Sequence, residues 1–271
     1  MSPFADLLLV FAAGLVTGLA TGLGVAPFFL VDEIGDRAIV ALWGLAVGIL
    51  LSASLFGLVG EGLAEGDPIS VAVGFTAGVV FVLAADRLVA SAEFSPRTTS
   101  ASAVDPNTLV LTVGVLTLHS LPEGIAVGVA FADLGLDGEG SLAFLGWEVP
   151  ALAVFVSVAV SILNVPEGLA IAIPLVAAGM ERWKVVGWAV FSGLPQPIGA
   201  VFAYVFVTSV EALLPLSFGF AAGALVYLVV VEFLPAGVAY GSELPRRGRP
   251  ELIGGIGVGL VSMIGLVVLV G

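Results

Sequence analysis

The only histidine of this 271-residue chain lies four residues before a glutamate, in the segment HSLPEG (119–124). Residues at positions i and i+4 of a helix share one face, so His119 and Glu123 can act together. The segment NVPEG (164–168) repeats the Pro-Glu-Gly core and places Glu167 in another apolar stretch. One imidazole and two carboxylates form a nitrogen and oxygen ligand set that suits Zn²⁺, Fe²⁺ or Mn²⁺. The three residues therefore predict a site for a divalent cation.

The apolar surroundings favour this interpretation. A charged side chain at the centre of a bilayer costs about 2.5–3.5 kcal/mol and usually faces the interior of a helical bundle, where it functions. Pro122 and Pro166 each leave a backbone carbonyl without its helical donor, and broken helices at matching depth are typical of transporter sites. A buried hydrogen bond and a packing kink are the structural alternatives. Glu232, which precedes Pro235, has two interpretations: structural pairing, or an acid on the exit path of an ion.

The composition identifies the elements that must position these residues. Hydrophobic residues make up 59% of the chain and charged residues 11%, whereas soluble domains carry about 25% charged residues. We therefore expect an all-α integral membrane protein, with the bilayer and a divalent metal ion as partners. The absence of cysteine excludes disulfides and thiolate metal sites. A net charge of −13 disfavours a nucleic-acid partner.

Eight apolar stretches long enough to cross a bilayer predict eight transmembrane helices. They form a single transmembrane domain, residues 1–271, and residues 91–107 are expected to be a flexible cytoplasmic linker because they are rich in Ser, Thr, Pro and Ala. The expected spans are approximately 4–30, 38–60, 69–90, 108–132, 148–179, 183–208, 213–238 and 252–271.

The basic residues orient this arrangement. With eight spans, every lysine and arginine falls in a loop on the same side of the membrane. Because basic residues are enriched in cytoplasmic loops, that side is predicted to be cytoplasmic, with both termini extracellular and the protein in the plasma membrane. The basic residues are Arg37, Arg87, Arg97, Arg182, Lys184, Arg246, Arg247 and Arg249.

At the paired segments HSLPEGIAVGVAF (119–131) and NVPEGLAIAIPL (164–175), the chain resembles the ZIP family of divalent metal transporters. Residues 44–58, 191–201 and 220–235 resemble further spans of that family. The resemblance implies a transporter rather than an enzyme, with Zn²⁺, Fe²⁺, Mn²⁺ or Cd²⁺ as substrate and no cofactor. It also implies a homodimer and uptake toward the cytoplasm by alternating access, in which spans 1, 4, 5 and 6 move against spans 2, 3, 7 and 8.

Carried over from the family, the main metal site consists of His119, Glu123 and Glu167. Two further ligand positions of the family are lost, because Leu163 and Leu50 stand there. The adjacent second site has only neutral groups, which are expected to be weak ligands or to support the metal ligands: Ser120, Asn164 and Gln196. We therefore expect one metal ion between spans 4 and 5, with Zn²⁺ as the first choice.

Two other functions remain open from the sequence. The lost ligand positions are compatible with a non-transporting metal sensor or a structural membrane protein. A His and two glutamates could instead hold the catalytic metal of an intramembrane hydrolase. The chain has no H-E-x-x-H pair, which disfavours the hydrolase.

Overall fold

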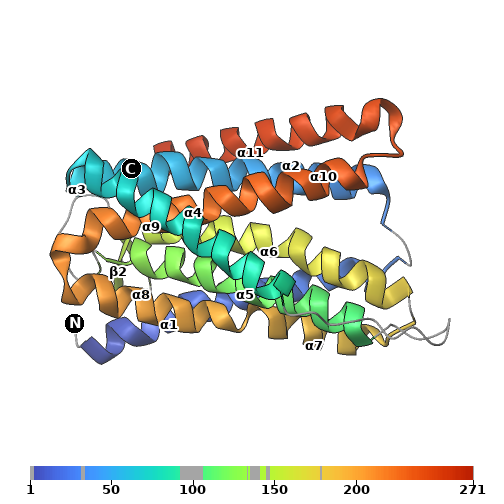
Figure 1. The fold of residues 1–271 in the computed structure, drawn as a ribbon, viewed down its shortest axis with the longest axis horizontal. Coiled ribbons are helices and arrows are strands. Elements are labelled where there is room, and N and C mark those ends of the chain that lie inside the picture. Colours follow the sequence, from blue (N-terminus) through green and yellow to red (C-terminus); the bar gives the residue numbers. More distant parts are fainter. Residues whose placement is uncertain are drawn as a thin grey trace.

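A computed structural model describes residues 3–31, 34–91, 106–132, 134, 141–144, 147–177 and 179–270, and most of them are helical (Figure 1). The first half contains α1 (Pro3–Ala20), the 3₁₀ segment η1 (Thr21–Phe29), α2 (Asp36–Ser52), the π-helical η2 (Ala53–Leu58), α3 (Val59–Glu65), α4 (Pro68–Ser91) and α5 (Pro106–Ala130). The second half contains strands β1 (Ser141–Phe144) and β2 (Trp147–Pro150), then α6 (Ala151–Ala177), α7 (Arg182–Gly193), α8 (Pro195–Ser209), the 3₁₀ turn η3 (Glu211–Leu213), α9 (Leu214–Leu228), the π-helical η4 (Val229–Phe233), α10 (Leu234–Tyr240), the turn η5 (Pro245–Gly248) and α11 (Arg249–Val270).

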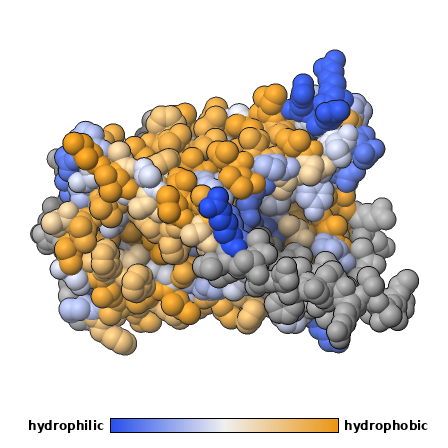
Figure 2. Space-filling view, viewed as in Figure 1, coloured by the Kyte–Doolittle hydropathy of each residue, from blue (hydrophilic) through white to orange (hydrophobic). Residues whose placement is uncertain are grey.

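Apolar side chains cover the middle of the bundle, as expected for a surface in contact with lipid (Figure 2). Among the described residues, six helical stretches are long and apolar enough to cross a membrane: 3–29, 36–65, 68–87, 151–176, 182–209 and 214–240. Helices α5 and α11 are 25 and 22 residues long. The chain is thus a mostly helical, multi-pass membrane protein. Both chain ends lie at the same end of the bundle (Figure 1).

The helices pack into two groups. In the first group α8 packs against α5 and α1, and η1 packs against α6 and α7. In the second group α2 packs against α11 and α10, and α4 packs against α9. The groups meet where α5 contacts α9 and where α2 contacts α6.

Glycines allow the backbones within each group to approach closely, as is common in membrane helices. A Cβ atom at Gly168 of α6 would overlap the Thr21 carbonyl oxygen at the start of η1. A Cβ atom at Gly124 of α5 would overlap the carbonyl oxygen of Gln196 in α8. Gly124 and Gly168 directly follow Glu123 and Glu167, so close helix contacts lie beside the predicted metal ligands.

Several helices are broken in the middle. Segments η2 and η4 are π-helical, and such segments occur frequently at functional sites. Pro195 is the first residue of α8, directly after the break from α7, at a position where the helix does not use the backbone N–H that proline lacks. In contrast, α6 continues through Pro166 and Pro174, and α5 continues through Pro122.

The segment before α6 differs from the expected span. The sequence predicts a fifth span from approximately Glu148, whereas Glu148 lies in β2, which pairs antiparallel with β1. Helix α6 begins three residues later, at Ala151. The backbone N–H and C=O groups of the two strands form hydrogen bonds with each other in this hairpin. The predicted all-α fold contains no such strands. Most of the expected linker, residues 92–105, lies outside the described residues.

Candidate metal centre

Two glutamates from neighbouring helices form the most deeply buried acidic pair among the described residues. Glu123 of α5 is fully buried and Glu167 of α6 is 1% exposed. Their side chains interact directly, and atom Oε1 of each is buried without a hydrogen-bond donor from the described residues. Two adjacent carboxylates in an apolar interior repel each other unless a cation or a proton lies with them. The donor set therefore suits a small divalent cation.

An amide network surrounds one side of this pair. Gln196 Nε2 donates a hydrogen bond to Glu123 Oε2 at 2.6 Å. The side-chain amides of Gln196 and Asn164 also pair reciprocally, with both N···O distances at 3.2 Å. Asn164 Nδ2 donates in addition to the carbonyl oxygen of Thr17. The network connects α1, α5, α6 and α8 beside Glu123 and fixes which end of each amide faces the carboxylate.

His119 is held by two acids from the other helix group. Its Nε2 atom forms a hydrogen bond of 2.8 Å with Asp86 Oδ1 from α4. Its Nδ1 atom lies 2.9 Å from Glu232 Oε2 in η4, an ion-pair distance. The geometry of a hydrogen bond is met at Nε2 but not at Nδ1, so the contact with Glu232 is a close approach of charges only. His119 is buried, whereas the side chains of Asp86 and Glu232 are 26% and 25% exposed.

The predicted site residues are therefore distributed over two adjacent groups. Glu123 and Glu167 lie together, with Gln196 and Asn164 at hydrogen-bond distance. Among the described residues, one group of three side chains could hold a metal ion, because its ligand atoms all lie within 4.8 Å of one another. The three residues are Asp86, His119 and Glu232. His119 belongs to this second group, one helical turn from Glu123. The structure thus does not bring His119, Glu123 and Glu167 into one compact ligand set.

The remaining predicted positions are also in the interior. Ser120 is 2% exposed and Asn164 and Gln196 are fully buried. Leu50 and Leu163, which stand where the resemblance implies lost ligands, are fully buried in the apolar core. Neither leucine offers a donor atom.

Asp86 is the site residue that the sequence did not single out. It lies near the end of an apolar stretch and precedes Arg87, so it resembled a residue at the membrane surface. Asp86 lies in the last quarter of α4 and inside the expected span 69–90. An acidic residue within a membrane span is unusual, so this position could have indicated a functional residue. Glu232 was expected to be an exit-path acid or a structural partner, and it lies directly against His119.

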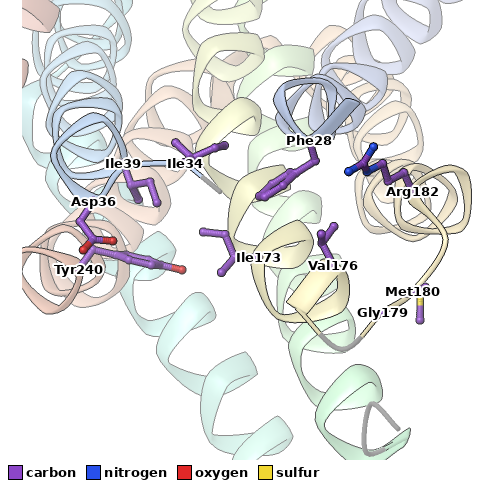
Figure 3. A pocket seen from close by; sticks show the side chains of 10 residues that line it. All are labelled: Phe28, Ile34, Asp36, Ile39, Ile173, Val176, Gly179, Met180, Arg182 and Tyr240. Atoms are coloured by element: carbon purple, nitrogen blue, oxygen red, sulfur yellow. The ribbon is translucent and has the colours of Figure 1, made fainter. Parts of the chain in front are cut away.

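A cavity of about 590 Å³ opens between η1, α2, α6, α7 and α10 (Figure 3). Aliphatic and aromatic side chains, among them Phe28 and Ile173, form much of its wall (Figure 3). Asp36, Arg182 and Tyr240 provide polar groups. The cavity lies between elements of both helix groups, so a movement of one group relative to the other changes its width.

Comparisons with known proteins place the chain in a family. The sequence model described as ZIP zinc transporter matches residues 145–268. The chain is 30% identical over 258 residues to the zinc transporter GufA of Myxococcus xanthus, with 92% of this chain and 95% of that relative covered. It is 29% identical over 281 residues to the zinc transporter ZupT of Corynebacterium efficiens, with 96% and 98% covered.

A plant relative from Arabidopsis thaliana is 35% identical over 222 residues, which are 82% of this chain and 33% of the plant protein. The chain therefore spans about a third of that relative, but nearly the full length of the two bacterial ones. The likeness that the PEG segments indicated is confirmed over almost the whole sequence. The chain belongs to the ZIP family of transporters.

Proposed function

We propose that this protein carries divalent metal cations, with Zn²⁺ as the first choice, across the plasma membrane toward the cytoplasm. The observation that carries the proposal is the buried pair of Glu123 and Glu167, each with an oxygen atom that lacks a donor. A divalent cation neutralises both carboxylates and supplies the missing partner. The relatives named zinc transporters support Zn²⁺, and their names give no support to the metallo-hydrolase alternative.

In this proposal the metal ion binds at two successive sites. The first is the carboxylate pair of Glu123 and Glu167, which is closed off from solvent. The second is the group of His119, Asp86 and Glu232, whose two acids are partly exposed. His119 and Glu123 lie one turn apart on α5, so a metal bound by Glu123 can reach His119 by a short step. His119 must release a carboxylate or a proton to bind the ion, because both of its nitrogens face acids in this conformation.

The neutral amides support a single metal ion at the buried pair. The nitrogen of Gln196 faces Glu123, and a nitrogen that donates a hydrogen bond repels a cation. Asn164 holds Gln196 in this orientation through the reciprocal amide pair. A second ion beside Glu123 would have to rotate both amides. Gln196 and Asn164 are therefore assigned to positioning Glu123.

For the topology we propose eight spans, with both termini on the extracellular side. Helices α5 and α11, added to the six apolar stretches, give a total of eight spans. Both termini lie at the same end of the bundle, which supports an even number of membrane crossings (Figure 1). In the eight-span arrangement the described basic residues lie at or near the connections on one side of the membrane, which supports a cytoplasmic assignment for that side. The cavity lined by Asp36 and Arg182 would then open toward the cytoplasm.

Alternating access is proposed as a movement of α1, α5, α6, α7 and α8 against the remaining helices. The packing supports this division, because each group is held together by close helix contacts and His119 bridges the two groups through ionisable side chains. Such contacts can be broken and remade by a passing cation. We also propose a homodimer, on the family resemblance alone.

Reconstitution into liposomes tests the proposal. We expect Zn²⁺ uptake above that of protein-free vesicles, with Fe²⁺, Mn²⁺ and Cd²⁺ measured in parallel to define the range of substrates. Glu123→Ala should abolish the uptake. A protein that binds Zn²⁺ but transports none of the four ions would be a sensor. Uptake that survives in Glu123→Ala would contradict the assigned site.

A further inference from the structure

Three arginines gather at the turn that joins α10 to α11. Figure 2 shows hydrophilic side chains projecting at this end of the bundle, where Figure 1 places the connection between the two helices. A cavity of about 600 Å³ lies at the turn. Its walls are formed by Arg246, Arg247, Arg249, Pro250 and Ile253. None of these residues lines the cavity of Figure 3, and none belongs to the metal centre.

The charges of these arginines are not neutralised by the part of the chain that the structure describes. All three side chains are exposed, and none forms an ion pair with a described acid. Two other basic residues differ, since Arg37 pairs with Glu251 and Lys184 pairs with Glu181. The turn therefore presents a concentrated positive charge in a concave surface, and a concave basic site favours an anion.

The backbone holds the arginines in an unusual conformation. Arg246 and Arg247 have φ values of 57° and 56°, in the left-handed region that side chains other than glycine seldom adopt. Gly248 continues this conformation with φ of 62° and is buried, and a Cβ atom there would overlap Gly241. The contact between the two glycines fixes the turn against the end of α10. The arginine side chains therefore start from a rigid backbone, which lowers the entropy lost when they bind a ligand.

An apolar surface continues from the arginines along α11. Ile253 follows Arg249 by one helical turn and is 65% exposed, and Val258 and Val261 are exposed further along. Gly254 and Gly257 lie among them with open space where a side chain would be, so they leave a shallow depression. Cationic groups above an apolar strip match a ligand that has an anionic head and a hydrocarbon tail. A free phosphate ion would use only the arginines.

We propose that this turn binds the headgroup of an anionic phospholipid, with one acyl chain along the exposed face of α11. The planar guanidinium group of arginine forms paired hydrogen bonds with phosphate, which suits a headgroup better than a diffuse charge does. Basic pockets beside membrane helices are established sites for anionic headgroups. The lipid would anchor α11 and, through its contacts with α2, the helix group that stays in place during transport.

Native mass spectrometry of the full-length protein with phosphatidylglycerol or phosphatidylcholine tests this proposal. We expect preferential binding of phosphatidylglycerol. The variant Arg246→Gln/Arg247→Gln/Arg249→Gln should lose this preference, with roughly a fivefold loss of affinity for each arginine. The lysine variant Arg246→Lys/Arg247→Lys/Arg249→Lys keeps the charge and removes the paired hydrogen bonds, so it should bind with intermediate affinity. The control Lys184→Gln removes a basic charge outside the turn and should retain the preference.

The outcomes separate the alternatives. Equal phosphatidylglycerol binding by the glutamine variant and the wild type would overturn the proposal. Complete displacement of the lipid by millimolar inorganic phosphate would also overturn it, because the occupant would then be a free anion. Zn²⁺ uptake into vesicles made only of phosphatidylcholine should stay within about twofold of wild type in the glutamine variant, since the arginines are not metal ligands. The result of the lipid-binding measurement is therefore independent of whether the protein transports Zn²⁺.

Discussion

Gln196 donates a hydrogen bond from Nε2 to Glu123 Oε2 at 2.6 Å, so a neutral amide of α8 occupies one of the two carboxylate oxygens of Glu123. The orientation is fixed because Asn164 satisfies the rest of the Gln196 amide. A neutral donor at this point leaves Glu123 with one oxygen for a metal ion. This relationship leads directly to an expectation about stoichiometry.

Gln196→Glu should increase the number of bound Zn²⁺ ions from one to two per chain. The new carboxylate removes the donor that repels a cation and adds two acceptor oxygens beside Glu123. Elemental analysis of the purified protein measures the ratio. Gln196→Leu serves as the control, because it removes the same hydrogen bond without adding a ligand and should still bind one ion. A ratio of one in the glutamate variant would contradict the single-site explanation.

Asp86→Asn and Glu232→Gln should each slow transport by about tenfold or more while Zn²⁺ binding at the buried pair persists. Residues that orient a metal-binding histidine commonly change affinity or activity by 10–100-fold when they are replaced. Stopped-flow uptake together with equilibrium Zn²⁺ binding distinguishes the two effects. Loss of binding in both variants would mean that His119 and its acids form the only metal site.

Gly168→Ala should destabilise the protein by about 1–3 kcal/mol, because the added methyl group overlaps the Thr21 carbonyl oxygen. Gly187→Ala is the matched control. Gly187 lies in α7 with no atom within 4 Å of a Cβ at that position, so alanine there should be neutral or stabilising. Thermal unfolding in detergent compares the two variants. Equal unfolding temperatures would show that η1 and α6 are not in tight contact at Gly168.

Asp67 should stabilise the start of α4 in a pH-dependent manner. Its Oδ1 atom accepts hydrogen bonds from the backbone nitrogens of Ile69 and Ser70 at 3.0 and 2.9 Å, and its Oδ2 atom accepts one from the Ser70 hydroxyl. The Ser70 hydroxyl and then the backbone bonds hold the pKa of Asp67 below its ordinary value of 3.8. A lowered pKa in the folded protein means that the stabilisation is complete above about pH 4 and is lost as the pH falls through the folded pKa.

Asp67→Ala should therefore lower the unfolding temperature at pH 7, whereas Asp67→Asn, which keeps an acceptor oxygen for the cap, should lower it less. The difference between Asp67→Ala and wild type should shrink at acidic pH. A difference that is the same at pH 3 and pH 7 would show that the carboxylate form is not what stabilises the helix start.

The sequence predicted the helical membrane class and the two helices of the site because both depend on local patterns. A run of apolar residues and a Pro-Glu-Gly repeat can be read directly, and the burial of Glu123 and Glu167 follows from their place in such runs. The partners of His119 could not be predicted in this way. Asp86 and Glu232 come from α4 and η4, and only the packing of non-consecutive helices brings them to the imidazole.

Two further features had no readable signal. The π-helical turn that carries Glu232 differs from the regular helix by one extra residue per turn, which leaves no mark in the hydrophobic pattern. Each strand of the β1–β2 hairpin has only four residues. An alternation of apolar and polar residues over so short a segment cannot be distinguished from the start of an apolar helix. The expected position of Glu148 at the start of a helix was wrong for this reason.

The central claim is that the buried pair of Glu123 and Glu167 carries the transported ion. Zn²⁺ uptake into liposomes by Glu167→Gln tests it most directly, because the substitution keeps the shape of the side chain and removes its charge. Glu243→Gln, at an exposed position of the α10–α11 connection, is the matched control. We expect uptake to fall to the level of protein-free vesicles in Glu167→Gln and to remain at the wild-type rate in Glu243→Gln. Wild-type uptake by Glu167→Gln would contradict the account.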